Sequence, residues 1–294
     1  MKNILLSSLV ASLLVTGCIA NEVTPQNSAV KQVNNTAISK ARKNATQNQV
    51  KVVQEAVDSL KYAHDALNEL NKGNKDKASE YLEKSLGKLE VTLASKNVPE
   101  LLPVDSHITI DELVASSDAI KSIVKHAKEL LDDDKLQEAK AILAPLKSEI
   151  DISVVSLPLA TYPDALKETA KLIHDNKVEE AKVVLNTALN TLVVTETIIP
   201  IPLVEATDLI AAAAEVAEKD PKKAKLYLDA AQEALKISKQ LGYVSKSDVT
   251  YKALDDAISA LKLDVTSAEV KGFFSNLQNK LKDFTSKVFS PKNK

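Results

Sequence analysis

Residues 165–192, ALKETAKLIHDNKVEEAKVVLNTALNTL, decide the fold. Apolar residues recur every three or four positions in the two halves of this segment, and the polar residues 174–177 separate the halves. Each half therefore has one apolar face when it is wound into a helix of 3.6 residues per turn. The segment predicts a hairpin of two helices joined by a short turn.

The same pattern occurs four times along the chain. The repeats align on Ala78, Ala139, Ala181 and Ala224. Apolar residues stand at the same offsets from each alanine: Leu82, Leu143, Leu185 and Leu228; Leu89, Ile150, Leu192 and Leu235; Leu70, Leu131, Ile173 and Val216; Ala63, Val124, Leu166 and Leu209. Five glycines and ten prolines leave few interruptions of long helices. The sequence thus predicts a mainly α fold, with consecutive helical hairpins that form a bundle or a short solenoid.

Each predicted turn offers a residue that can cap the following helix. The cap candidates are Asn74, Asp134, Asn176 and Asp220. Gln137 and Glu179 stand three residues after two of these caps, as in a capping box, and Pro221 fits the first helical position. Capping also explains the acidic run 132–134, which lacks the spacing of a calcium loop.

Short β segments are predicted between the hairpins. Residues 107–110, 151–156 and 193–199 are rich in β-branched side chains and partly alternate between apolar and polar. Two interpretations are open: the runs pair in a small sheet, or they are extended linkers.

The middle of the chain resembles the YfdX proteins of bacterial envelopes. The resemblance rests on Leu157-Pro158-Leu159, on Ala165-Leu166-x3-Ala170-Lys171-Leu172-Ile173, and on Asp175-Asn176-Lys177-x2-Glu180-Ala181-x3-Leu185-x2-Ala188-Leu189 followed by Leu192-Val193-Val194. It extends over roughly residues 45–200, and one more hairpin and a tail follow. The resemblance implies a mostly helical secreted or envelope protein without established catalytic residues, connected with stress responses and chaperone-like.

The N-terminus has the layout of a bacterial lipoprotein signal peptide. Lys2 precedes the apolar run 4–14, and Val15-Thr16-Gly17-Cys18 looks like a lipobox. We expect cleavage before Cys18, the only cysteine, and its modification with diacylglycerol and an acyl chain such as palmitate. Because two or more acyl chains hold a protein stably on a membrane, Cys18 would be a permanent anchor. An ordinary signal peptide with a chance cysteine is the alternative.

The chain is therefore expected to be exported, with Ile19 favouring the periplasmic face of the outer membrane. The predicted organisation is a signal peptide over 1–17, a polar tether over 18–46, a helical-hairpin domain over 47–262 and a basic amphipathic helix over 263–294. A helix that already begins at Ile38, in the second half of the tether, is the alternative for that segment. Without a second cysteine, the exported part has no internal disulfide and depends on packing.

The C-terminal tail is the second unusual segment. It contains all four phenylalanines, and residues 271–294 carry six lysines against one aspartate. Phe274, Leu277, Leu281, Phe284 and Val288 form one apolar stripe, and Phe273 lies beside it. These six residues are candidates for contact with an anionic membrane or a partner protein. The alternative is that the stripe packs on the rest of the protein.

Motifs for enzyme chemistry are not found. The four histidines, His64, His107, His126 and His174, have no metal-ligand spacing, and there is no GxSxG, P-loop or GxGxxG sequence. The body before the tail is acidic, which argues against nucleic-acid binding. No cofactor is expected.

The sequence therefore favours a non-enzymatic, lipid-anchored binding or assembly module, with protein clients or a homo-oligomer as possible partners. A structural envelope protein that makes contact through its C-terminal helix is the alternative.

Overall fold

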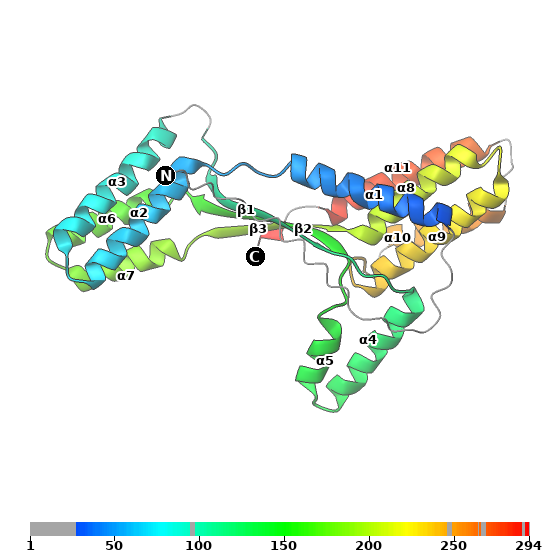
Figure 1. Cartoon of the computed structure of the whole chain (residues 1–294), viewed down its shortest axis with the longest axis horizontal. Coiled ribbons are helices and arrows are strands. Elements are labelled where there is room, and N and C mark those ends of the chain that lie inside the picture. Colours follow the sequence, from blue (N-terminus) through cyan, green and yellow to red (C-terminus); the bar gives the residue numbers. More distant parts are fainter. Residues whose placement is uncertain are drawn as a thin grey trace. The chain divides into compact units, whose positions relative to one another are not determined.

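The computed structural model describes residues 28–94, 98–245, 249–263, 265, 269–289 and 292–293. The helices are α1 (Ser28–Gln47), α2 (Gln54–Asn71), α3 (Lys75–Leu93), α4 (Ser117–Asp132), α5 (Leu136–Leu143), α6 (Tyr162–His174), α7 (Val178–Leu189), α8 (Ile201–Val216), α9 (Pro221–Gln240), α10 (Val249–Leu263) and α11 (Val270–Val288). The strands are β1 (Leu101–Asp111), β2 (Glu149–Pro158), β3 (Val193–Pro200) and β4 (Lys292–Asn293) (Figure 1). The predicted mainly α fold with short strands is confirmed.

All four predicted hairpins are present, as α2–α3, α4–α5, α6–α7 and α8–α9. The aligned alanines, Ala78, Ala139, Ala181 and Ala224, are at most 1% exposed. An alanine at the contact lets two helix backbones approach closely, because only a methyl group separates them. The predicted alignment therefore marks the positions where the helices of each hairpin meet.

The chain folds into two compact units. The described residues of the first unit belong to the segments 1–48, 108–151 and 197–290, and those of the second belong to 49–107, 152–196 and 291–294. The hairpin domain predicted for residues 47–262 thus supplies helices to both units.

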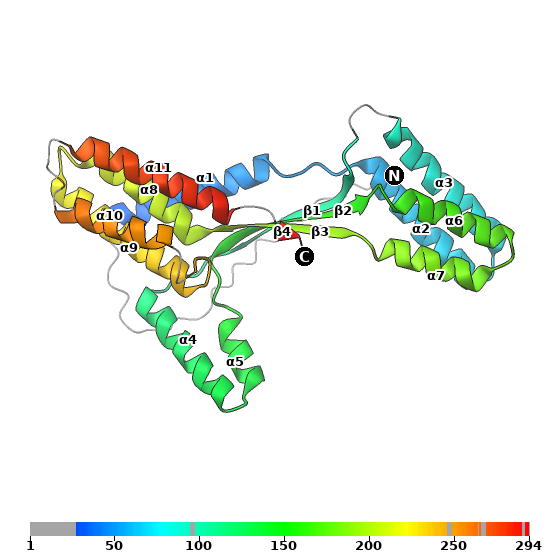
Figure 2. The same ribbon diagram turned by 180° about the vertical axis from the view of Figure 1, so that it is seen from behind.

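The second unit is a bundle of α2, α3, α6 and α7. Each helix contacts two of the others, since α2 packs on α3 and α7, and α6 packs on α3 and α7 (Figure 2). Leu70, Leu82, Tyr162, Leu166 and Leu185 lie in its core and are fully buried. The apolar faces predicted from the periodicity thus face one another.

The first unit is built around α8, which contacts α1, α9 and α11. Its sequence, IPLVEATDLIAAAAEV, is apolar on nearly all sides, as expected for a helix with neighbours all round. Leu203, Leu209, Ile210 and Ala213 are fully buried. Helix α10 completes the unit by packing on α9 and α11.

The three predicted β segments form strands of one sheet, in the order β1-β2-β3-β4. Strand β4 pairs antiparallel with β3, with Thr195 opposite Asn293 and Glu196 opposite Lys292. The sheet interpretation is therefore correct, and the extended-linker alternative is not.

The predicted tether over residues 18–46 is wrong from residue 28 onward. Residues 28–47 form α1, which packs on α8. Val30, the adjacent pair Ala37 and Ile38, and Ala45 follow one another at intervals of seven or eight residues and are buried, so a narrow apolar stripe runs through a polar sequence. The beginning of the predicted tether and the signal peptide lie outside the described residues.

The turns differ from the capping prediction at two of the four sites. Asp134 and Asn176 both have φ of 61° and end the first helix of their hairpins, instead of capping the second. Asn176 N donates to Ile173 O at 3.1 Å, and Lys177 N donates to Leu172 O at 2.8 Å. This is the helix-ending arrangement that favours Gly, Asn or Asp, because these residues tolerate positive φ.

The other two turns agree better with the prediction. Asn74 occupies the N-cap position of α3, although its side chain donates to Glu69 at 2.8 Å instead of capping. Asp220 caps α9 as predicted, accepting from Lys223 N at 3.0 Å, and Pro221 follows it. The capping boxes with Gln137 and Glu179 do not form, since the N-cap positions there are Lys135 and Lys177.

The backbone conformation at Asn176 leads to a test. We expect Asn176→Ala to be less stable than Asn176→Gly by about 1 kcal/mol, since alanine at positive φ is strained. Both variants lose the 2.6 Å hydrogen bond from Lys75 to Asn176, so that loss cancels in the comparison. Urea unfolding followed by circular dichroism measures the difference. Equal midpoints and slopes for the two variants would contradict the assignment.

Candidate functional site

The predicted contact stripe of the C-terminal helix is mostly buried. Phe274, Leu277, Leu281 and Phe284 are 1–3% exposed and belong to the core of the first unit. Helix α11 packs this stripe on α8 and α10. The prediction of membrane or partner contact is therefore wrong for these four residues, and the folded-back alternative is correct for them.

Two predicted contact residues remain, Phe273 and Val288. Phe273 is 53% exposed. Val288 ends α11, and its side chain is outside the described part of the chain, as is the lipidation candidate Cys18. Among the predicted contact residues, only Phe273 therefore lies on the surface that the structure describes.

Phe273 borders a cleft between α10 and α11. The cleft has a volume of about 520 Å³, and its lining includes Ala257, Ala260, Leu277 and Lys280. Leu263, the last residue of α10, is 86% exposed. Together, Leu263 and Phe273 place two large apolar side chains on this part of the first unit.

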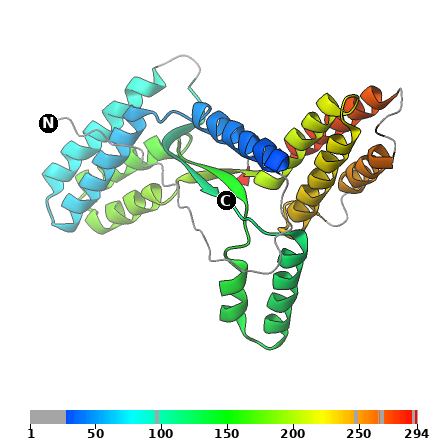
Figure 3. The same ribbon diagram turned by 45° about the vertical axis from the view of Figure 1, so that its right-hand side comes forward.

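The α4–α5 hairpin, drawn in green in Figure 3, carries a second group of exposed apolar residues. Leu131, Leu136 and Leu143 are 45%, 61% and 37% exposed. Neither of the two apolar cores of the described residues includes a residue of α4 or α5. The hairpin is attached to the first unit by contact of α4 with α9, where Ser117 N donates to Glu233 at 2.8 Å. We call the three leucines the hairpin leucines.

The exposure of the hairpin leucines follows from a difference between this repeat and the others. Helix α5 has only eight residues, whereas α3, α7 and α9 have at least twelve. Ile150, which aligns with Leu89 and Leu235 on helices of other hairpins, lies in strand β2 instead. The sequence prediction missed this surface because it placed Ile150 on a helix face, as in the other repeats.

A third candidate is the carboxyl group of Glu205 in α8. Burial, and to a smaller extent the negative charge of Glu112, raises the pKa of Glu205 to about 7. No described residue forms a hydrogen bond or ion pair with Glu205, whereas Glu112 is paired with Arg42 at 2.8 Å. A glutamate with this pKa gains or loses its proton near neutral pH, so it makes the first unit sensitive to pH.

Further polar contacts surround the same end of α8. Lys147 forms an ion pair with Asp111, and Ser148 N donates to the Tyr243 hydroxyl at 2.9 Å. Burial raises the pKa of Tyr243 as well, so this phenol stays protonated. These contacts hold the ends of β1 and β2 beside the start of α8, where Ile201 N donates to Ser148 O at 2.9 Å. Sequence reasoning had no signal for Glu205, because it is one polar residue among apolar neighbours.

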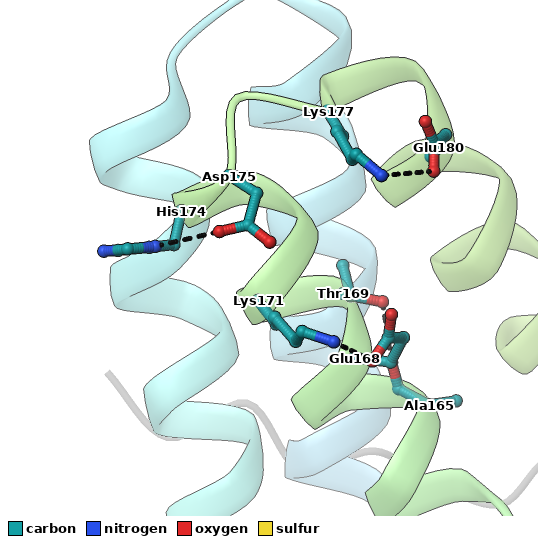
Figure 4. Close-up of polar contacts among 8 residues, drawn as sticks. All are labelled: Ala165, Glu168, Thr169, Lys171, His174, Asp175, Lys177 and Glu180. Atoms are coloured by element: carbon teal, nitrogen blue, oxygen red, sulfur yellow. Dashed lines mark hydrogen bonds and ion pairs between the residues drawn. The ribbon is translucent and has the colours of Figure 1, made fainter.

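The histidines lie on the surface. The side chains of His107, His126 and His174 are 54%, 61% and 90% exposed, and each lies 3.2–3.7 Å from a carboxylate of its own segment. Figure 4 shows His174 beside Asp175 at the α6–α7 turn, near the Lys171–Glu168 and Lys177–Glu180 pairs. Exposed pairs of this kind contribute less than about 1 kcal/mol each and form no enclosed site.

Metal clusters and membrane-spanning helices are both absent from the described residues. In these segments no three His, Cys, Asp or Glu side chains are grouped so that they could hold a metal ion. No helix there combines the length and the apolar character that a membrane span requires.

The titration of Glu205 predicts how stability depends on pH. The folded-state pKa of about 7 lies above the ordinary value of 4.5, so ionisation costs the folded state more than the unfolded state. The free energy of unfolding of the first unit should therefore fall as pH rises from 4.5 to about 7, by as much as about 3 kcal/mol. Glu205→Gln should remove this decrease and be more stable than the parent at pH 8.

Thermal unfolding between pH 4 and pH 8 measures the effect, and Glu215→Gln, at an exposed position of the same helix, is the matched control. An unchanged pH dependence in Glu205→Gln would show that another group is responsible.

Comparison with known proteins identifies part of the chain. The model of the family described as "YfdX protein" matches residues 59–198. A solved structure of YfdX from Salmonella Typhi is 15% identical; the match covers 51% of this chain and 93% of that one, with a TM-score of 0.35. No curated protein matches the chain. The family match begins within α2 and ends within β3, so α1 and α8–α11 lie outside it. Residues 59–198 are therefore a YfdX-family region of the chain.

Proposed function

We propose that this protein is a non-enzymatic, lipid-anchored module of the bacterial envelope that binds apolar segments of unfolded proteins. The observation that carries the proposal is the exposure of the hairpin leucines, Leu131, Leu136 and Leu143, on a hairpin outside both apolar cores. A protein that holds unfolded clients needs apolar surface that its own fold does not cover.

The composition of the α4–α5 hairpin fits reversible binding. Fully burying one leucine contributes about 1.5–3 kcal/mol, so three partly exposed leucines provide a weak contact with an extended apolar segment. Exposed charged residues lie around them, among them Lys125, Lys128 and Asp132. A charged rim keeps such a surface soluble while it is empty.

The position of the hairpin in the chain also supports the proposal. Helices α4 and α5 lie within the segment that matches the YfdX family. The predicted anchor at Cys18 would hold the module on a membrane of the envelope, with the periplasmic face of the outer membrane as the proposed location. This agrees with the chaperone-like role that the sequence resemblance implies.

Client aggregation tests the binding surface. We expect the parent protein, at a stoichiometric amount, to suppress light scattering by an unfolding client. Replacing Leu131, Leu136 and Leu143 together by Gln should weaken this protection about tenfold in the concentration required, the equivalent of about 1.4 kcal/mol of lost binding. Val183→Gln is the matched control, because Val183 is 66% exposed on α7.

The result is interpretable only if the triple variant keeps the helical circular dichroism spectrum of the parent. Full protection by a folded triple variant would refute the role of the hairpin leucines. Failure of the parent to protect would refute the chaperone-like function itself.

Metabolic labelling tests the anchor independently. In cells fed radioactive palmitate, we expect the parent to be labelled and to sediment with membranes. Cys18→Ala should abolish both, since Cys18 is the only cysteine and the predicted site of lipidation. Labelling of the Cys18→Ala variant, or an unlabelled parent, would contradict the prediction.

A further inference from the structure

We infer that one end of the first unit, where α10 ends and α1 and α11 begin, rests on the lipid surface to which Cys18 anchors the chain. The inference rests on the lipid anchor of the proposed function and is independent of client binding. In this arrangement, the exposed side chains of Leu263 and Phe273 contact the headgroup region of an anionic membrane.

The anchor is close to the first unit along the chain. Helix α1 starts at Ser28 and is held on the unit by buried Val30 and by the 3.3 Å ion pair of Lys40 with Asp208. Only residues 19–27 separate Cys18 from Ser28. Even fully extended, this stretch spans no more than about 35 Å. A lipidated Cys18 therefore keeps the start of α1 within that distance of the membrane.

Ion pairs show which end of α8 lies toward the start of α1. Lys40 meets Asp208, and Arg42, two residues later, meets Glu112, whose charge acts on Glu205. A later residue of α1 thus corresponds to an earlier residue of α8, so the two helices run antiparallel. Ser28 lies about 18 Å back along α1 from Lys40, at about 1.5 Å per residue. Helix α1 therefore begins toward the end of α8 that leads into α9, as Figure 1 shows.

The start of α11 lies at this same end. Lys271, in the first turn of α11, forms a 2.8 Å ion pair with Glu218, which follows α8. Phe273 is two residues further on, and it shares the α10–α11 cleft with Ala260 near the end of α10. The exposed pair Leu263 and Phe273 is thereby placed at the end of the unit that the anchor holds near the membrane.

The chemistry of this end suits a lipid interface. Leu263 is 86% exposed and Phe273 is 53% exposed, and large apolar side chains gain free energy by entering the boundary between headgroups and acyl chains. Lys219, between α8 and α9, and Lys222, in the first turn of α9, are exposed at the same end of the unit. A lysine near an anionic surface strengthens the attraction. Glu218, Asp220 and Glu269 are also at this end and oppose the attraction, so the contact is expected to be weak alone and effective only with the anchor.

The absence of tryptophan from the chain allows a direct test. Phe273→Trp in the lipidated full-length protein introduces a single fluorescent reporter, and Val183→Trp, at an exposed position of the second unit, is the matched control. Each protein is reconstituted in vesicles of phosphatidylethanolamine and phosphatidylglycerol, with or without brominated acyl chains. We expect brominated lipid to quench Phe273→Trp and its emission to shift to the blue, with no change for Val183→Trp. Adding Lys219→Glu and Lys222→Glu should reduce the quenching.

The outcomes separate the inference from the proposed function. A vesicle-bound Phe273→Trp protein that brominated lipid does not quench overturns the inference and leaves the anchor intact. A blue shift without quenching would mean that Leu263 and Phe273 contact a second copy of the chain or a client, and this result also overturns the inference. If the protein does not associate with vesicles or carry palmitate, the anchor of the proposed function fails, and the inference fails with it.

Discussion

Both units depend on close contact between helices at buried alanines. Ala63 and Ala78 in the second unit, and Ala213 and Ala224 in the first, are completely buried. An alanine contributes little apolar area, so the free energy of packing comes from the leucines that close contact brings together. A larger side chain at one of these sites would separate the helices and leave those leucines apart, which is why the repeats align on alanine.

Much of the fold could be predicted from the sequence because these contacts are periodic. The spacing of Ala181 from Leu166 and Leu185 defines a hairpin without any reference to its neighbours, and the β-branched runs indicate the strands in the same local way. The first half of helix α1 was missed because its apolar residues are sparse, and a polar helix and a polar tether have similar compositions. Its stripe becomes a convincing helix face only when α8 is known to cover it.

The candidate sites were less predictable, because each depends on what lies next to a residue and not on the residue itself. The stripe of Phe274, Leu277 and Phe284 has the same pattern whether it meets a membrane or a core, so only the packing of α11 on α8 and α10 decides between them. Glu205 titrates near neutral pH because surrounding helices bury it and Glu112 approaches it. Leu143 is 37% exposed on the short helix α5, although the residues aligned with it in the other repeats, Leu82, Leu185 and Leu228, are fully buried.

The docking of α1 also changes how the predicted anchor would act. A tether that extended over residues 18–46 would have a root-mean-square reach of roughly 25–30 Å and would hold the domain clear of the lipid headgroups. With residues 28–47 folded onto α8, only residues 19–27 remain, and a flexible stretch of that length would have a root-mean-square reach of only about 15–18 Å. Membrane contact would then require little additional free energy, because the proposed anchor would already restrict the first unit to the region near the bilayer. The α4–α5 hairpin belongs to this same unit. In the proposed function, attachment to the membrane and binding of clients would therefore both belong to one folded unit, and both would depend on the helices that pack around α8.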